Sequence, residues 1–494
     1  MLISGLALGA VLGFVMQRGR FCVTGFLRDI FTQRSWRGFV ALLIVISVHA
    51  IGLAALTSAG VIAPEYNELA PLAVIVGGVI FGLGIVLAGG CASGTWYRSG
   101  EGLIGSWIAL VFYALSAAAM KTGFLNGLQD SLKDRTVGLT SIHASLGISI
   151  WPLVIALSAV TAYFAVRFLR EEFSGPRPAT LAPRKSGLAH ILTEKAWHVY
   201  ATAAIVGVLG VIAWPLSAAT GRNDGLGITT PSSNLANYVV TGDTERFDWG
   251  VLLVLGILVG SFIAAKASGE FRLRVPDATQ GARSVVGGIF MGVGAAWAGG
   301  CTVGNGMVQT SLFSYQGWLA LASIAAGVAI AAKLWLKPSA PSLNDVPSTP
   351  STTNDTAVSA ISPVTSTATS PVSLPGSEGA GAAGTEASPL AGAFTVAPVA
   401  LLDRSVVKQE DGKLKPLGDG RYELDTVGAV CPFPLIEAKD AINKIEVGEE
   451  LVIPFDCTQA TDAIPRWAAK DGHKVTNFEQ TGEAGWTISV RRGR

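Results

Sequence analysis

One short cysteine motif occurs twice in this chain, each time at the end of a glycine-rich apolar stretch. Gly-Gly-Cys-x-x-Gly spans residues 89–94 and again residues 299–304. The match extends upstream, because nine of the 18 positions in 77–94 are identical to those in 287–304. In membrane proteins, paired glycine-interrupted segments in two halves point to a substrate site at the repeat interface. The candidate binding residues are Gly89, Gly90, Cys91, Gly94, Gly299, Gly300, Cys301 and Gly304.

The composition favours a membrane protein. Half of the residues are hydrophobic and 14% are charged, against roughly 25% charged residues in soluble domains. The net charge of +1 argues against a nucleic-acid partner. Nine stretches are long enough for membrane helices. They lie near 2–17, 36–58, 69–90, 101–120, 144–168, 198–218, 249–265, 284–300 and 317–336.

Loop charges predict the orientation. Alternate loops, beginning with the one after the first helix, hold 15 Lys and Arg residues, whereas the remaining loops hold 5. Positive loops face the cytoplasm, so we expect the N-terminus outside and the C-terminus inside. The two Gly-Gly-Cys motifs then end the third and eighth helices, which run in opposite directions. The duplication is therefore predicted to be an inverted repeat with Gly-rich cysteine loops.

The chain divides into three predicted segments: a membrane domain over 1–337, a linker over 338–400 and a small domain over 401–494. The linker is rich in Ser, Thr, Pro, Ala and Gly, which indicates a disordered tether. The last segment alternates strand and helix patterns in the order βαβαββ. Such a segment is predicted to form a two-layer α/β sandwich.

Three of the five cysteines fall in the membrane half. A free cysteine in a helix is usually a small buried apolar residue. The duplication of Cys91 and Cys301 favours a functional role, because glycine neighbours permit close approach of a ligand. Cys22 follows Arg18-Gly-Arg-Phe, which indicates either positive-inside anchoring or the exit of an anion path. Carboxylates are absent from the expected spans except Glu101 at an edge, which disfavours a proton-relay pump or cation channel.

The other two cysteines lie in the small domain. Cys431 precedes Pro-Phe-Pro between a predicted strand and helix, so it is expected at or near a helix N-cap. The positive end of the helix dipole favours the reactive thiolate there. Cys457 ends the next strand, and it is either a resolving or accepting thiol or a buried residue. The cysteine spacing matches no zinc or haem motif, so we expect no metal and no cofactor.

Two family resemblances rest on these motifs. Residues 1–336 resemble the YeeE/YedE family of thiosulfate transporters through Gly-Arg-Phe-Cys22, Gly-Gly-Cys91 and Gly-Gly-Cys301. The C-terminal segment resembles the TusA-like sulfur-carrier domains, most closely their YeeD branch, through Cys431-Pro-Phe-Pro and Asp-Cys457-Thr-Gln-Ala.

The resemblance implies thiosulfate uptake across the inner membrane. The three membrane cysteines would pass thiosulfate along by weak S–H···S bonds, and the cytoplasmic domain would take sulfur from it through Cys431 and Cys457. Membrane lipids and downstream sulfur-acceptor proteins are the other partners implied. Two alternatives stay open: a transporter of another sulfur or selenium species, and a membrane-anchored sulfurtransferase.

Overall fold

The computed structural model describes residues 2–336 and 414–493. The predicted tether over 338–400 lies outside the described residues, so that interpretation stays a prediction.

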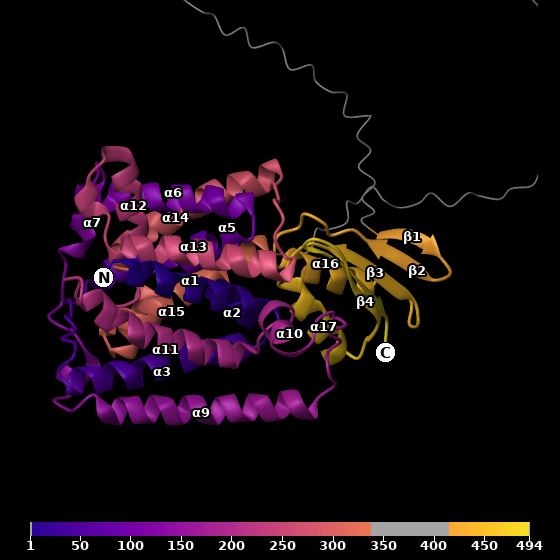
Figure 1. Ribbon diagram of the computed structural model, residues 1–494, viewed down its shortest axis with the longest axis horizontal. Helices are drawn as coiled ribbons and strands as arrows, with labels where there is room; N and C mark the ends of the chain where they lie inside the picture. The colour runs from indigo at the N-terminus through magenta and orange to yellow at the C-terminus, as the bar shows by residue number, and fades with distance from the viewer. Residues whose placement is uncertain (1, 337–413, 494) are drawn as a thin grey trace, which may run out of the picture. The chain divides into compact units, whose positions relative to one another are not determined.

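The first part, residues 2–336, is a bundle of long apolar helices (Figure 1). Eight of its described segments, each a single helix or two successive helices, are long and apolar enough to cross a membrane. Its elements are α1 Ile3–Arg18, α2 Val23–Thr32, α3 Arg37–Ser58, α4 Pro71–Leu87, α5 Ala92–Gly100, α6 Ile104–Lys121, α7 Asn126–Lys133, α8 Ile142–Ser145, α9 Trp151–Ser174, α10 Gly187–Thr193, α11 Val199–Ala218, α12 Thr229–Thr241, η1 Thr244–Arg246, α13 Trp249–Ser268, α14 Ala278–Ala298, the π-helix η2 Gly304–Gln309, and α15 Tyr315–Trp335.

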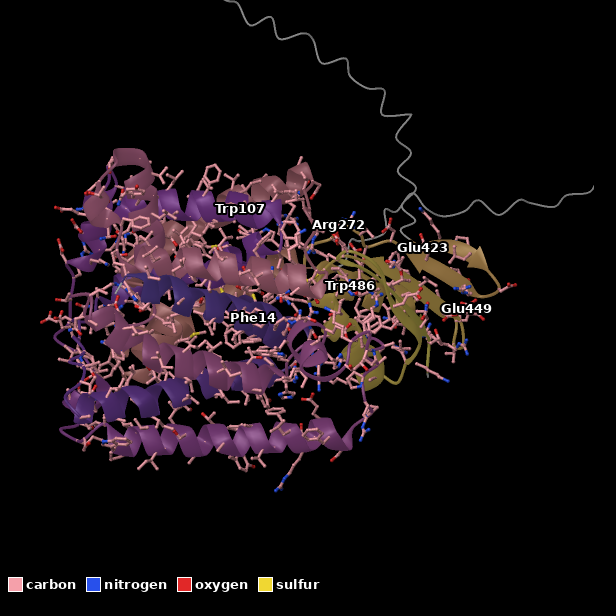
Figure 2. The ribbon with its side chains drawn as sticks, in the orientation of Figure 1. Phe14, Trp107, Arg272, Glu423, Glu449 and Trp486 are labelled. Carbon is pink, nitrogen blue, oxygen red and sulfur yellow. A yellow bond between two sulfur atoms is a disulfide. The ribbon has the colours of Figure 1, made fainter. Side chains whose placement is uncertain are left out.

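The multi-pass helical fold is confirmed, with one difference in the count. The eighth expected span, near 284–300, is helical as α14 but is not one of these eight segments. Its many glycines and alanines, together with Arg283, make it less apolar than its neighbours. It nevertheless packs between α4 and α6. Large apolar side chains such as Trp107, which is 39% exposed, lie on the outside of the bundle (Figure 2), a pattern typical of a membrane-embedded surface.

Glycine contacts give the directions of the helices. A Cβ added to Gly77 would lie 2.7 Å from the carbonyl oxygen of Gly294, and one on Gly84 would lie 2.8 Å from that of Gly287. Residue numbers therefore rise along α4 as they fall along α14, so these helices are antiparallel. In the repeat, Gly77 corresponds to Gly287 and Gly84 corresponds to Gly294. Gly77 thus contacts the counterpart of Gly84, and Gly84 contacts the counterpart of Gly77. This reciprocal contact confirms the inverted repeat.

We expect Gly77→Ala to lower the stability of the bundle. Its new Cβ would lie 2.5 Å from the backbone nitrogen of Ala298, and overpacking of this kind costs about 1–3 kcal/mol. Thermal unfolding of purified protein in detergent measures the effect. The matched control is Gly281→Ala on α14, where the added Cβ meets nothing within 4 Å. A Gly77→Ala variant as stable as this control would show that the α4–α14 contact is looser than described.

The second part, residues 414–493, is a five-stranded sheet with two helices. Its elements are β1 Leu414–Gly418, β2 Arg421–Leu424, α16 Phe433–Ile442, β3 Glu450–Phe455, α17 Ala460–Lys470, β4 Lys474–Gly482 and β5 Gly485–Arg491. The strand order is β1-β2-β3-β5-β4, and β2 and β3 are the parallel pair. The α/β sandwich is confirmed, with one additional strand: β1 pairs antiparallel with β2 and was not predicted.

This part has a hydrophobic core of its own. Trp486 on β5 is 2% exposed and stacks on Phe455 of β3 with ring centroids 5.9 Å apart (Figure 2). Buried residues of α16 and α17, including Leu435 and Ile464, complete the core against the sheet. The sheet, both helices and the core thus lie within one short stretch of chain.

Candidate functional site

Each membrane cysteine lies at a break in a helix. Cys22 is the N-cap of α2, and Cys91 is the N-cap of α5. Cys301 lies two residues before Val303, the N-cap of η2. All three are free thiols and at most 2% exposed. The expected loops over 91–100 and 301–316 are therefore wrong in detail, because both stretches are folded segments buried within the bundle.

The repeated glycines make the turns at two of these breaks. Gly89 and Gly299 have φ values of +71° and +76°, a backbone conformation that favours glycine. Gly90 and Gly300 follow them and precede the cysteines. Gly94 lies in the first turn of α5 and Gly304 begins η2. The four Gly-Gly residues thus turn the chain so that a cysteine meets the start of a short helical segment.

Cys22 and Cys91 come together although they are far apart in sequence. A Cβ added to Gly94 would lie 3.3 Å from Cys91 Sγ and 3.8 Å from Cys22 Sγ. The two sulfur atoms therefore lie at the same place in the bundle. Ser93 Oγ lies 3.4 Å from Cys91 Sγ. Helix starts at α2 and α5, each without a side-chain cap, add partial positive charge beside the pair.

A buried arginine stands next to this thiol pair. Arg98, near the end of α5, is 5% exposed, and one guanidinium nitrogen lies 3.9 Å from Cys22 Sγ. Its other terminal nitrogen donates to the carbonyl oxygen of Gly89 in the turn before Cys91. A cation thus adjoins two thiols in a buried setting, which is suited to a small anion. The sequence pattern gives no sign of this role for Arg98, because a basic residue beyond an apolar run usually marks a loop.

Cys301 occupies a second, separate turn. The backbone N–H of Val303 donates to Cys301 Sγ at 3.4 Å. The amide of Asn305 donates to the carbonyls of Ala298 and Gly300 at 2.8 and 3.0 Å, which closes the turn. These contacts hold Cys301 in a turn of its own.

Tyr113 belongs to the same buried core as Cys91 and Cys301. It lies on α6 and is fully buried. Its hydroxyl donates to Thr229 Oγ1 at 2.8 Å, at the start of α12. Nothing in the sequence pattern around Tyr113 marks it, so only the fold could reveal this position.

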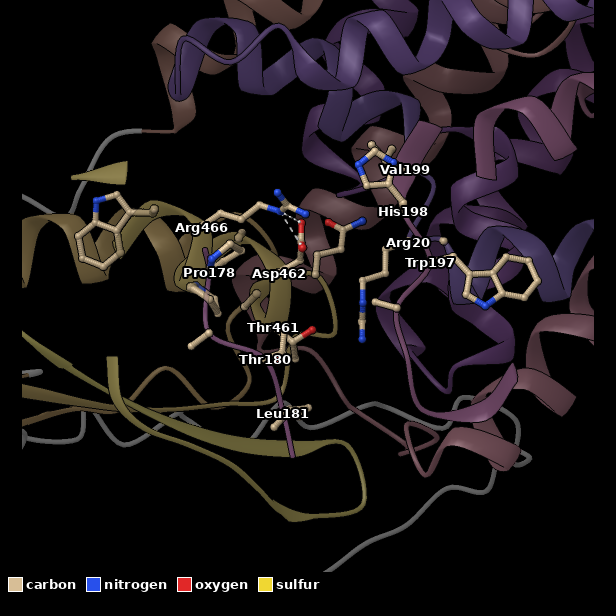
Figure 3. Close-up of a pocket in the computed structure, with 18 of the residues that line it drawn as sticks. Arg20, Pro178, Thr180, Leu181, Trp197, His198, Val199, Thr461, Asp462 and Arg466 are labelled. Atoms are coloured by element: carbon tan, nitrogen blue, oxygen red, sulfur yellow. Dashed lines mark hydrogen bonds and ion pairs between the residues drawn. The ribbon is translucent and has the colours of Figure 1, made fainter. Parts of the chain in front are cut away.

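A charge cluster lies at the ends of α1 and α13. Glu270 accepts hydrogen bonds from Gln17 at 2.6 Å, Arg18 at 3.2 Å and Arg20 at 2.9 Å. Burial raises the pKa of Glu270, but the two arginines outweigh it and hold this pKa below its usual value. Arg20, labelled in Figure 3, thereby has its charge matched by a carboxylate. Arg18 and Arg20, which precede Cys22, thus join the end of α1 to the end of α13 as well as adding positive charge.

The cysteines of the second part lie together at one edge of its sheet. Cys431 follows β2 and Cys457 follows β3; because parallel strands end at the same edge, the two residues meet there. They form a disulfide, with their Cα atoms 6.3 Å apart. Cys431 precedes Pro432, the N-cap of α16, which agrees with its expected place near a helix start. The peptide bond between them is cis.

Hydrogen bonds fix the loops that carry this pair. Asp456 Oδ1 accepts from the backbone N–H of Gly428 at 3.0 Å, and Thr426 Oγ1 donates to the carbonyl of Pro454 at 2.9 Å. On α17, Arg466 Nε donates to both Asp462 oxygens, at 2.8 and 2.9 Å (Figure 3). The loop before Cys431 is therefore tied to the end of β3, just before Cys457.

Comparisons with known proteins match both parts. A sequence profile described as "Sulphur transport" matches residues 18–330, and one described as "Sulfurtransferase TusA" matches residues 422–492. The thiosulfate transporter TsuA of Escherichia coli (strain K12) is 51% identical over 66% of this chain and 93% of its own length. TsuA of Spirochaeta thermophila is 32% identical over 65% of this chain and 94% of its own length. TsuB of E. coli, named as a candidate sulfur carrier, is 59% identical over 14% of this chain and 93% of its own length.

Proposed function

The chain belongs to the sulphur-transport family and carries a TusA-type sulfurtransferase domain after it, and from this premise we propose that it takes up thiosulfate and hands it to that domain. The observation that carries the proposal is the pair of buried thiols, Cys22 and Cys91, beside the Arg98 guanidinium. Thiosulfate is a dianion with a soft terminal sulfur. The guanidinium and the helix starts suit its charge, and the thiols suit its sulfur.

Uptake proceeds between the two cysteine turns. Cys301 and the Cys22–Cys91 pair bind the anion in succession, with Tyr113 in the same buried core. An S–H group is a weak donor, so each station holds the anion weakly enough to release it. Weak binding at several sites is what conduction requires.

The second part consumes the substrate. The Cys431 thiolate attacks the sulfane sulfur of thiosulfate, the sulfur–sulfur bond breaks, and sulfite leaves. Cys431 then carries a persulfide, whose sulfur passes to an acceptor. Consumption of thiosulfate at the exit keeps uptake favourable without a pump. Cys457 acts beside Cys431 in this proposal.

Uptake into vesicles tests the proposal. Sealed membrane vesicles that contain the full chain are expected to accumulate ³⁵S-labelled thiosulfate. Among unlabelled anions, thiosulfate is expected to compete best with the labelled substrate. Better competition by sulfite or a selenium oxyanion would assign another substrate. Absence of uptake together with sulfur transfer in the membrane fraction would identify a membrane-anchored sulfurtransferase instead.

The proposed location is the inner membrane, embedded in its lipids, with the N-terminus outside and the C-terminal domain in the cytoplasm. The excess of positive charge on the proposed inner side remains when the buried Arg18, Arg28 and Arg98 are left out. We expect a membrane-impermeant thiol reagent to label Arg135→Cys but not Ser186→Cys in intact cells, because both positions are exposed and they lie in opposite loops. Labelling after cell lysis is the control. The reverse pattern would invert the proposed topology.

We expect Arg98→Met to lower thiosulfate uptake mainly through a higher apparent KM. Loss of hydrogen bonds to a charged group costs about 1.5–3 kcal/mol, or roughly a ten- to hundredfold change. Arg98→Lys keeps the charge but loses the planar fork, so it should retain part of the uptake. Thermal unfolding of both variants separates this effect from loss of the bond to Gly89. Equal uptake by all three proteins would remove Arg98 from the proposed site.

A further inference from the structure

The Cys431–Cys457 disulfide shows which second thiol can reach the reacting sulfur. The two cysteines are separated by 26 residues, and the parallel β2–β3 pair brings them to one sheet edge. Hydrogen bonds from Gly428 to Asp456 and from Thr426 to Pro454 hold the two loops together. A persulfide on Cys431 therefore places the Cys431 Sγ atom within bonding distance of Cys457 Sγ.

We propose that Cys457 resolves the Cys431 persulfide and releases its sulfur as hydrosulfide. The Cys457 thiolate attacks the Sγ atom of Cys431, a sulfur–sulfur bond forms between the two cysteines, and the bond from Cys431 Sγ to the outer sulfur breaks. The outer sulfur leaves as HS⁻ with the bonding electron pair. It is reduced, and the two cysteine sulfurs are oxidised to the disulfide. This inference rests on the proposed formation of the persulfide.

The surroundings of Cys457 suit an attacking thiol. α17 begins at Ala460, whose N–H donates to the carbonyl of Cys457 at 3.0 Å, so the thiol lies within one turn of a helix N-terminus. The positive end of a helix favours a thiolate. Cys457 lies next to Cys431 at the same sheet edge, so it reaches the persulfide without diffusion. Attack from inside the domain is thus favoured over attack from solution.

The disulfide is then the spent form of the domain. It holds no free thiolate at Cys431 and accepts no further sulfur. A dithiol reductant, such as a thioredoxin-class protein, returns both cysteines to thiols and is itself oxidised to a disulfide. The balance is one thiosulfate and one dithiol giving one sulfite, one hydrogen sulfide and one oxidised dithiol. The domain therefore acts as a thiosulfate reductase rather than only as a carrier that passes a persulfide onward.

A single turnover without added reductant tests the inference. Residues 402–494 can be used alone, because this part has its own sheet and core and matches 93% of the free-standing TsuB. Reduced protein, freed of reductant, is mixed with thiosulfate without oxygen. The parent is expected to yield about one sulfite and one sulfide per domain and to lose two hydrogen atoms in mass as the disulfide forms. Cys457→Ser should yield sulfite, retain one added sulfur on Cys431, and release less than about a tenth of that sulfide.

The outcomes separate the two proposals. A parent domain that keeps the persulfide and releases no sulfide would overturn the resolving role, while the proposed sulfur transfer would stand. Transfer of the added sulfur to Cys457 would also overturn it, in favour of a relay. A disulfide that forms equally fast without thiosulfate would also overturn the resolving role, because the two cysteines would then be oxidised without any release of sulfide. Neither sulfite nor adduct in either protein would instead refute the proposed function. Cys457→Ala serves as a second variant for the same test. Formation of the Cys431 persulfide in this variant shows that the domain has folded.

Discussion

Cys91→Ala and Cys301→Ala are each expected to lower thiosulfate uptake by about ten- to hundredfold, the loss that follows when a charged ligand loses a hydrogen-bond donor. Each thiol stands in a turn of its own, so neither can substitute for the other. Alanine keeps the Cβ and removes only the sulfur, and the Gly-Gly turns do not depend on the thiol. Initial rates of ³⁵S-thiosulfate uptake into cells measure the effect, with the amount of inserted protein determined in parallel.

A matched control separates lost chemistry from lost packing. Ser323→Ala also removes a buried polar group, whose hydroxyl donates to the carbonyl of Leu319 in its own helix α15. We expect this variant to transport at the parent rate. Full uptake by either cysteine variant at normal abundance would refute the relay through the repeated thiols.

Much of the membrane site could be predicted because duplication is visible in sequence. The offset of 210 residues identified both cysteine turns, and the odd separation of their helices predicted that these run in opposite directions, which the contacts of Gly77 and Gly84 confirm. The turns themselves followed from glycine, since Gly89 and Gly299 adopt positive φ. The sequence signal was strong there because backbone geometry restricts residue choice.

The rest of that site depends on contacts between distant segments. Cys22 meets Cys91 across 69 positions, and the Arg98 guanidinium reaches Cys22 from the far end of α5. Local patterns carry no signal for such pairs. Arg98 was read as a loop charge because a basic residue beyond an apolar run usually marks a cytoplasmic loop. Here α5 folds back into the bundle, where its backbone hydrogen bonds are satisfied within a helix.

In the small domain, the cysteine pair could have been predicted from the strand topology. The strands before Cys431 and Cys457 were both predicted, and a strand–helix–strand unit normally has parallel strands. Their ends must then share one sheet edge, which would have predicted the cysteine pair. β1 was missed because Pro416 and the glycine turns around it are poor strand signals.

Cys431→Ser is expected to abolish sulfur transfer from thiosulfate, by at least about a hundredfold, because a serine hydroxyl stays protonated where a cysteine is reactive as the thiolate. The helix start at α16 favours the charged sulfur but cannot ionise an alcohol. Residues 402–494 incubated with thiosulfate should gain one sulfur atom or form the disulfide in the parent, and do neither in the variant. Intact-protein mass spectrometry and sulfite release measure both steps.

The same substitution in the full chain separates chemistry from transport. If consumption at the exit drives uptake, Cys431→Ser should leave the initial binding of thiosulfate intact and lower its accumulation in cells. A flexible linker, as the sequence predicts for 338–400, would hold the domain near the membrane part at roughly millimolar effective concentration, so adding the free parent domain at micromolar levels should restore accumulation only in part. Parent-like accumulation by Cys431→Ser would mean that the membrane part transports without help. An adduct that persists in the variant would place the reacting thiol elsewhere, and Cys457 would then be the next residue to replace.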